Sequence, residues 1–229
     1  QAGTVLSLRE PLPLRTLAEL HDALAKPESL LSSEQWQAHL ELLLRLWRRG
    51  YAGNRAVVLK ATSNAGRVAP MLLAAAADAR AVYLNLRAEP YLATLLAGQN
   101  SALDLRGHAA ERARRMSTEL SPASAAVRAL STGELAAHAW LIERIAQHRV
   151  QGFDPLRVLS VDFDALLADV PAVLADVLRH FGLAADAVSI EAAARGPVMA
   201  QYSKAPEHPY TPAQRAEVLA ESRSRNAAE

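Results

Sequence analysis

Short apolar runs alternate with longer helical patterns along most of this chain. Aliphatic and β-branched runs predict strands over Gly3–Leu8, Arg55–Lys60, Ala81–Leu86 and Leu156–Val161. Apolar residues elsewhere recur every three or four positions, which predicts helices. One helix begins near residue 90, and the others span residues 14–25, 32–49, 68–77, 102–120, 132–148, 162–182, 184–194 and 212–228. Because helices separate the strands, the pattern predicts parallel βαβ units.

Two helix starts carry capping residues. Ser32, Ser33 and Glu34 begin a helix whose buried stripe is predicted to be Trp36, Leu40, Leu43, Leu44 and Trp47. Thr132 is predicted to cap the long helix that reaches His148. The whole pattern predicts a helix-rich α/β protein, with three α/β/α layers around a central, mostly parallel sheet. No repeat or low-complexity linker interrupts residues 1–229, so we expect a single domain.

Composition narrows the function classes. The chain has no cysteine, which excludes disulfides, thiolate metal sites and a cysteine nucleophile. A net charge of +1 argues against a nucleic-acid binder but allows a local basic site. No apolar run reaches the roughly 18–20 residues of a membrane span, and no secretory signal is visible, so we expect a cytoplasmic protein. The chain begins with Gln1 rather than Met, and we expect a fragment or a processed chain.

Charged and hydroxyl side chains follow the predicted strands. These residues are Arg9 and Glu10, then Lys60, Thr62 and Ser63, then Arg87, and finally Asp162 and Asp164. Ligands of parallel sheets bind at the carboxyl ends of the strands, and this set suits a phosphate or sulfate group. The alternative is that each cation is only a solvated surface residue. Asp162 and Asp164 are predicted to be turn and cap residues, and no histidine spacing suggests zinc, so no metal is expected.

The order of several motifs resembles the sulfotransferases of the P-loop superfamily. The segments that carry the resemblance are Val5–Pro11, Lys60–Ser63, Asp78–Arg87 with the following Pro90, Val158–Asp164, Phe181–Leu183 and the loop from Tyr202 to Tyr210. The resemblance covers nearly the whole chain and implies a P-loop NTPase-like fold. It also implies sulfuryl transfer from 3′-phosphoadenosine 5′-phosphosulfate (PAPS) to a hydroxyl or amine of a small-molecule or glycan acceptor.

The resemblance also implies roles for individual residues. Lys60 is the strand-end lysine, and Thr62 stands where cytosolic sulfotransferases have a catalytic histidine, so Glu10 is the candidate base. Arg87 matches the arginine that holds the 3′-phosphate of PAPS. The family usually has a serine several residues after this arginine. Here position 95 is Leu, and the nearest hydroxyl is that of Thr94.

One more loop adds to the resemblance, and the phosphosulfate-binding loop of the family is a departure from it. Ser203 and Lys204 are predicted to close over the nucleotide. The loop that cradles the phosphosulfate is expected before Gln1, because no Gly-x-x-x-x-Gly-Lys sequence occurs in the chain. Two alternatives remain open at this point: a non-catalytic sulfotransferase-like binding module, and a P-loop kinase-like enzyme. The cluster from Arg106 to Arg115 is predicted to be a solvated helix face.

Overall fold

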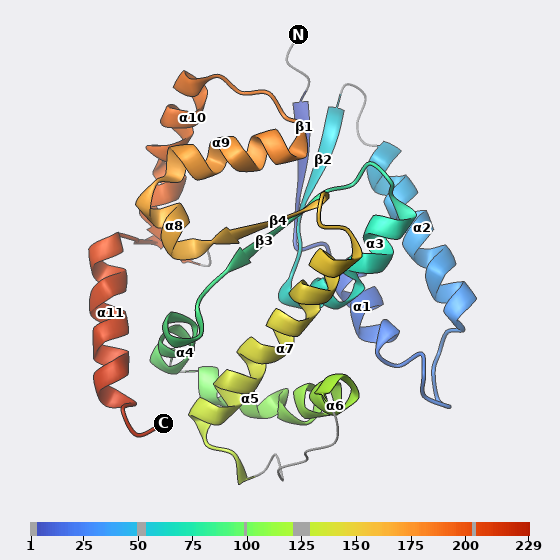
Figure 1. Cartoon of the computed structure of the whole chain (residues 1–229), viewed down its shortest axis with the longest axis horizontal. Helices are drawn as coiled ribbons and strands as arrows, with labels where there is room; N and C mark the ends of the chain where they lie inside the picture. Colours follow the sequence, from blue (N-terminus) through green and yellow to red (C-terminus); the bar gives the residue numbers. More distant parts are fainter. Residues whose placement is uncertain (1–3, 50–53, 99, 121–128, 203–204) are drawn as a thin grey trace. The chain divides into compact units, whose positions relative to one another are not determined.

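The computed structural model describes residues 4–49, 54–98, 100–120, 129–202 and 205–229. The protein is helix-rich with small parallel sheets, which places it in the α/β class (Figure 1). The chain folds into two compact units. Unit 1 comprises Gln1–Arg80 and Ala146–Pro155, and unit 2 comprises Ala81–Ile145 and Leu156–Glu229. That the whole chain forms one sulfotransferase-like domain stays a prediction.

Unit 1 is built around one parallel pair of strands. β1 (Thr4–Arg9) pairs with β2 (Asn54–Lys60), and the register places Arg9 opposite Lys60. The helical elements of this unit are α1 (Leu12–His21), α2 (Ser33–Arg49), η1 (Ser63–Val68), α3 (Ala69–Ala75) and the last part of α7 (Thr132–Phe153). The crossover between the two strands runs through α1 and α2, so both strands end at the same edge.

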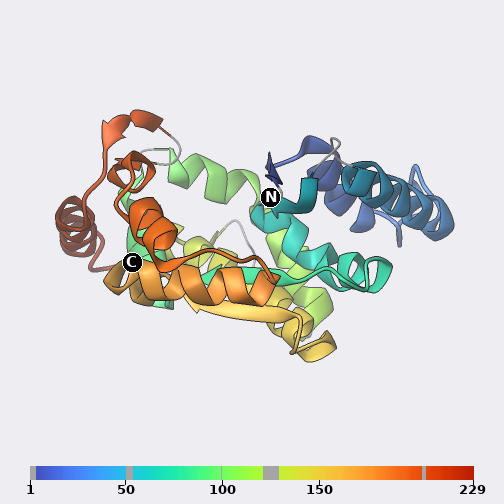
Figure 2. The ribbon, with the colours of Figure 1, turned by 90° about the horizontal axis from the view of Figure 1, so that it is seen from above.

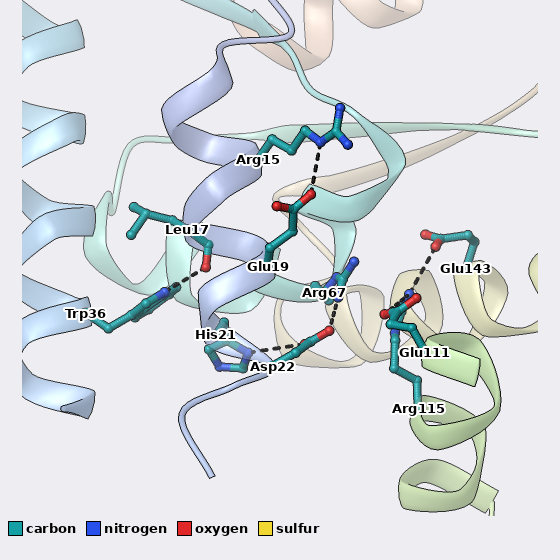
Figure 3. Close-up of polar contacts among 10 residues, drawn as sticks. All are labelled: Arg15, Leu17, Glu19, His21, Asp22, Trp36, Arg67, Glu111, Arg115 and Glu143. Atoms are coloured by element: carbon teal, nitrogen blue, oxygen red, sulfur yellow. Dashed lines mark hydrogen bonds and ion pairs between the residues drawn. The ribbon is translucent and has the colours of Figure 1, made fainter. Parts of the chain in front are cut away.

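α1 and α2 lie side by side in unit 1 (Figure 2). The core of this unit lies where these two helices and η1 meet. The indole Nε1 of the buried Trp36 donates a hydrogen bond to the Leu17 carbonyl at 2.8 Å (Figure 3). The predicted start of α2 is confirmed, since Ser32 and Gln35 exchange side-chain and backbone hydrogen bonds in a capping box. The predicted stripe of α2 is also confirmed: Trp36 and Leu40 are buried, and Leu43, Leu44 and Trp47 pack against this core.

Unit 2 holds a second parallel pair of strands. β3 (Ala81–Asn85) pairs with β4 (Val158–Asp162), with Asn85 opposite Asp162. Its helical elements are α4 (Ala88–Ala97), α5 (Ser101–Gly107), α6 (Ala109–Leu120), the first part of α7, α8 (Phe163–Ala168), α9 (Val170–Phe181), α10 (Ala187–Ala194), η3 (Pro197–Ala200) and α11 (Pro212–Arg225). Two short strands, β5 (Gln201–Tyr202) and β6 (Ala205–Pro209), form an antiparallel pair.

Small residues let the helices of unit 2 approach closely. Leu105, Ala109, Leu135, Ala136 and Ala139 form one buried cluster of α5, α6 and α7. α11 packs on α4, where the buried Ser222 hydroxyl donates to the Ala93 carbonyl at 2.7 Å. The three alanines of this cluster leave room for the helices to pack closely.

Several expectations from the sequence need correction. The four predicted strands are confirmed to within two residues at each end, but the loop predicted after α10 contains η3 and the β5–β6 pair. The cap of α7 is Ser131, not Thr132, since Ser131 and Glu134 exchange hydrogen bonds in a capping box. The helix continues past the predicted end to Phe153. One central sheet that joins all four strands stays a prediction, because the described strands form separate pairs.

The predicted solvated arginine face of residues 106–115 is wrong in part. The side chains of Arg112 and Arg115 are only 20% and 12% exposed. Arg115 lies between the carboxylates of Glu111 and Glu143, at 3.7 Å and 3.5 Å (Figure 3). Two arginines of this segment therefore connect helices within unit 2.

Candidate functional site

Glu10 and Lys60 meet at the carboxyl end of the β1–β2 pair. Because Arg9 is opposite Lys60 in the register, Glu10 is the first residue beyond the paired strands, and its backbone N–H donates to the Lys60 carbonyl at 2.6 Å. The Glu10 Oε1 lies 3.3 Å from the Lys60 Nζ. Both side chains are about half exposed, at 45% and 53%, so a ligand in solution can reach both groups.

The backbone of Glu10 adopts a left-handed conformation, with φ of 48°. Within the described residues it is the one non-glycine residue with positive φ. Pro11 follows directly and is the N-cap of α1, so the chain turns from strand to helix within these two residues. A left-handed glutamate is unfavourable by about 1–3 kcal/mol, and such residues concentrate at functional sites. The turn places a carboxylate at the strand edge.

Arg87 occupies the N-cap position of α4, two residues after β3 ends. Its side chain is 76% exposed, and its Nη2 lies 3.6 Å from Oδ2 of Asp164. The other carboxylate oxygen of Asp164 lies 3.0 Å from Nη2 of Arg215 on α11. One carboxylate therefore faces two guanidinium groups, and the more exposed of these belongs to Arg87.

A shallow pocket of about 470 Å³ lies beside Arg87 at the carboxyl ends of β3 and β4. The residues that line it are Asn85, Leu86, Arg87, Ala88, Trp140, Arg144, Ser160 and Asp162. The Asn85 Oδ1 accepts a hydrogen bond from Arg144 Nη1 at 2.8 Å, and the Asn85 Nδ2 donates to the Ser160 hydroxyl at 2.5 Å. The pocket thus presents two arginines and a hydrogen-bonded polar wall.

Carboxylates near this pocket are engaged by other groups. Asp162 caps α8 and accepts from the Ala165 backbone N–H at 2.9 Å, which confirms its predicted cap role. Glu89, in the first turn of α4, accepts hydrogen bonds from Arg223, and this contact lowers the pKa of Glu89. The pocket therefore favours an anionic ligand.

The other predicted site residues are Thr94, Ser203 and Lys204, and the structure adds less about their roles. The Thr94 hydroxyl donates its hydrogen to the Pro90 carbonyl within α4, at 2.7 Å. That bond uses the one proton the hydroxyl can donate, so a phosphate at Thr94 would have to compete with Pro90. Ser203 and Lys204 lie outside the described residues. The structure therefore brings Glu10 and Lys60 together in unit 1 and places Arg87 and Thr94 on α4 of unit 2.

Sequence reasoning missed the other polar and aromatic residues that line the pocket, which are Asn85, Trp140, Arg144 and Ser160. Asn85 and Ser160 belong to strand segments already singled out, so their positions near the strand ends were a usable signal. Trp140 and Arg144 are one helical turn apart on α7, and no local pattern indicates that this face meets the end of β3. Their place follows from tertiary packing.

Metal-binding clusters and membrane-spanning helices are both absent from the described part of the chain. No three or more His, Asp or Glu side chains there lie close enough together to hold a metal ion. Among the helices of that part, none is both long enough and apolar enough to cross a membrane.

Three comparisons of this chain with known proteins gave no match. No model of a known protein family matches the chain, and neither the curated proteins nor the solved structures include a significant match.

Proposed function

We propose that this protein is a sulfotransferase that moves a sulfuryl group from PAPS to a hydroxyl or amine of a small-molecule or glycan acceptor. The observation that carries the proposal is the 3.3 Å approach of Glu10 and Lys60 at the ends of two adjacent parallel strands. A carboxylate and an ammonium group at one strand edge provide a proton acceptor and a fixed positive charge. Sulfuryl transfer to a hydroxyl or amine is accelerated by both.

The reaction assigns one role to each of these residues. The acceptor oxygen or nitrogen attacks the sulfur, and its proton passes to the Glu10 carboxylate. The bond from sulfur to the bridging oxygen breaks, and the electron pair stays on the 5′-phosphate of the leaving adenosine 3′,5′-bisphosphate. Lys60 neutralises the charge that develops on the bridging oxygen. In such loose transition states, positioning and charge supply most of the rate.

The donor set around Arg87 fits the nucleotide product. Its guanidinium is 76% exposed at the start of α4 and lines the pocket that Arg144 also lines. A planar guanidinium binds phosphate through two parallel hydrogen bonds. Arg87 would hold the 3′-phosphate.

Calorimetry with adenosine 3′,5′-bisphosphate tests the proposal, on the protein in its full encoded length. We expect saturable binding, and we expect Arg87→Ala to weaken it by at least about 10-fold, because a charge-assisted hydrogen bond is lost. The matched control is Arg195→Ala, which removes an arginine that is 81% exposed and pairs with Glu191 four residues earlier. Absence of binding, or binding of ATP in its place, contradicts the proposal.

A further inference from the structure

The pocket beside Arg87 contains a second guanidinium, from Arg144 on α7. This side chain is partly buried, and its Nη1 donates to the Asn85 Oδ1 at 2.8 Å. Arg87 and Arg144 both line the pocket, although one follows β3 and the other comes from a helix much later in the chain. The pocket therefore receives positive charge from two independent elements.

Asn85 contacts the Arg144 guanidinium through its amide oxygen. Its amide nitrogen donates to the Ser160 hydroxyl at 2.5 Å and lies 3.3 Å from the Tyr83 carbonyl. Because the nitrogen is held by these two acceptors, the amide oxygen is left to accept from Arg144. The Asn85 oxygen therefore fixes one N–H group of the guanidinium in place.

Trp140 restrains the same guanidinium from a second direction. Its Nε1 donates to the Leu86 carbonyl at 2.9 Å, which fixes the indole at the end of β3. The guanidinium carbon of Arg144 lies 5.9 Å from the centre of the indole ring, within range of a cation–π interaction. An arginine held on two sides has lost part of its rotamer freedom before a ligand arrives, which favours binding.

The charges around the pocket indicate the class of ligand. Two arginines line it, against one carboxylate, Asp162, which already caps α8. Asp164 faces Arg87 from α8, and Glu143, next to Arg144 in sequence, lies 3.5 Å from Arg115. A phosphate monoester carries between one and two negative charges at neutral pH and several acceptor oxygens, which suits two guanidinium groups better than a singly charged anion does.

We infer that Arg144 binds the same phosphate monoester as Arg87, and that Asn85 is the residue that positions it. The inference rests on the proposed function, in which that phosphate is the 3′-phosphate of the nucleotide.

Calorimetry with two ligands tests the assignment on the full-length protein. Adenosine 3′,5′-bisphosphate carries the 3′-phosphate, and adenosine 5′-phosphate lacks it. We expect Arg144→Ala to weaken binding of the bisphosphate by about 10- to 100-fold and binding of the monophosphate by less than about 3-fold. Arg144→Lys is expected to give an intermediate loss, because an ammonium group lacks the planar fork, and it serves if the alanine variant does not fold. Arg195→Ala is the matched control and is expected to change neither affinity.

The positioning role of Asn85 has its own readout. Asn85→Ala is expected to weaken bisphosphate binding, and the double variant Asn85→Ala/Arg144→Ala is expected to lose no more than Arg144→Ala alone. Additive losses would show that Asn85 does not act through Arg144.

The outcomes separate the two proposals. Equal losses of both ligands in Arg144→Ala, or no loss of either, would overturn the assignment of Arg144 and leave the proposed function standing. Failure of the unmodified protein to bind the bisphosphate would overturn the proposed function and this inference together.

Discussion

The Nζ of Lys60 lies 3.3 Å from the Oε1 of Glu10 because both residues come at the carboxyl end of the β1–β2 pair. The strands are parallel, so their carboxyl ends share one edge even though α1 and α2 separate them in sequence. The left-handed backbone of Glu10 then turns the chain toward α1. The pair therefore results from strand register and a strained turn together.

Replacing Glu10 by Gln tests the proposed base. We expect PAPS turnover with hydroxyl and amine acceptors to fall by about 10²- to 10⁴-fold, because the amide cannot accept the acceptor's proton. Stability is expected to change by less than about 1 kcal/mol, since the ion pair is half exposed. The control is Glu19→Gln, which alters an exposed glutamate paired with Arg15 on α1 (Figure 3). Equal turnover in the two variants would remove Glu10 from the reaction.

Asp164 competes with a phosphate for Arg87. Its Oδ2 lies 3.6 Å from that guanidinium, so Asp164→Asn removes a negative charge beside Arg87. We expect the affinity for adenosine 3′,5′-bisphosphate to rise about two- to five-fold, measured by calorimetry. Asp176→Asn, which alters an exposed pair with Arg179 on α9, is expected to leave the affinity unchanged. Weaker binding in Asp164→Asn would show instead that this carboxylate holds Arg87 in its binding position.

The ion pair between Asp22 and Arg67 stabilises unit 1. The side chains are only 19% and 10% exposed, and the pair links the end of α1 to η1 (Figure 3). Arg67→Met removes the arginine from this carboxylate, so we expect the free energy of unfolding to fall by about 3 kcal/mol, measured by urea denaturation. Arg48→Met breaks the exposed pair with Asp78 and is expected to lower it by less than about 1 kcal/mol. If both variants lost a similar free energy of unfolding, the Asp22–Arg67 pair would stabilise the protein no more than the exposed pair does.

His21 makes the stability of the protein depend on pH. Burial lowers the pKa of His21, and the positive charge of Arg67 lowers it further. Its ring packs edge-on against Trp36, with 5.0 Å between the ring centres. Below about pH 6.5 the unfolded chain protonates this histidine while the folded chain resists, so stability falls as pH falls through that value. Above it, His21 contributes no pH dependence.

Urea denaturation at pH 5.5 and 7.5 measures this effect. We expect His21→Gln to lose less stability between the two pH values than the unmodified protein does. An equal loss in both would assign the pH dependence to other groups. His39→Gln is the control, because that histidine is exposed on α2.

Local patterns predicted the secondary structure of this protein well. Apolar runs located β1 to β4, and Ser32 located the start of α2. Both signals are local, because strand periodicity and helix capping involve residues that are close in sequence. The same reasoning chose Thr132 where Ser131 is the cap, since two adjacent hydroxyls differ only in which one reaches the helix backbone. It also missed β5, which is only two residues long, and β6, which contains two prolines.

The sequence by itself determined the helix-rich α/β class and the strand-end residues Glu10, Lys60 and Arg87, because strand ends can be located from local hydrophobicity. Tertiary structure decided which of these residues meet. Lys60 pairs with Glu10 through the register of two strands, and Arg144 reaches Asn85 only because α7 packs where β3 ends. Contacts between segments far apart in the chain depend on packing and register, and these are properties of the folded chain as a whole.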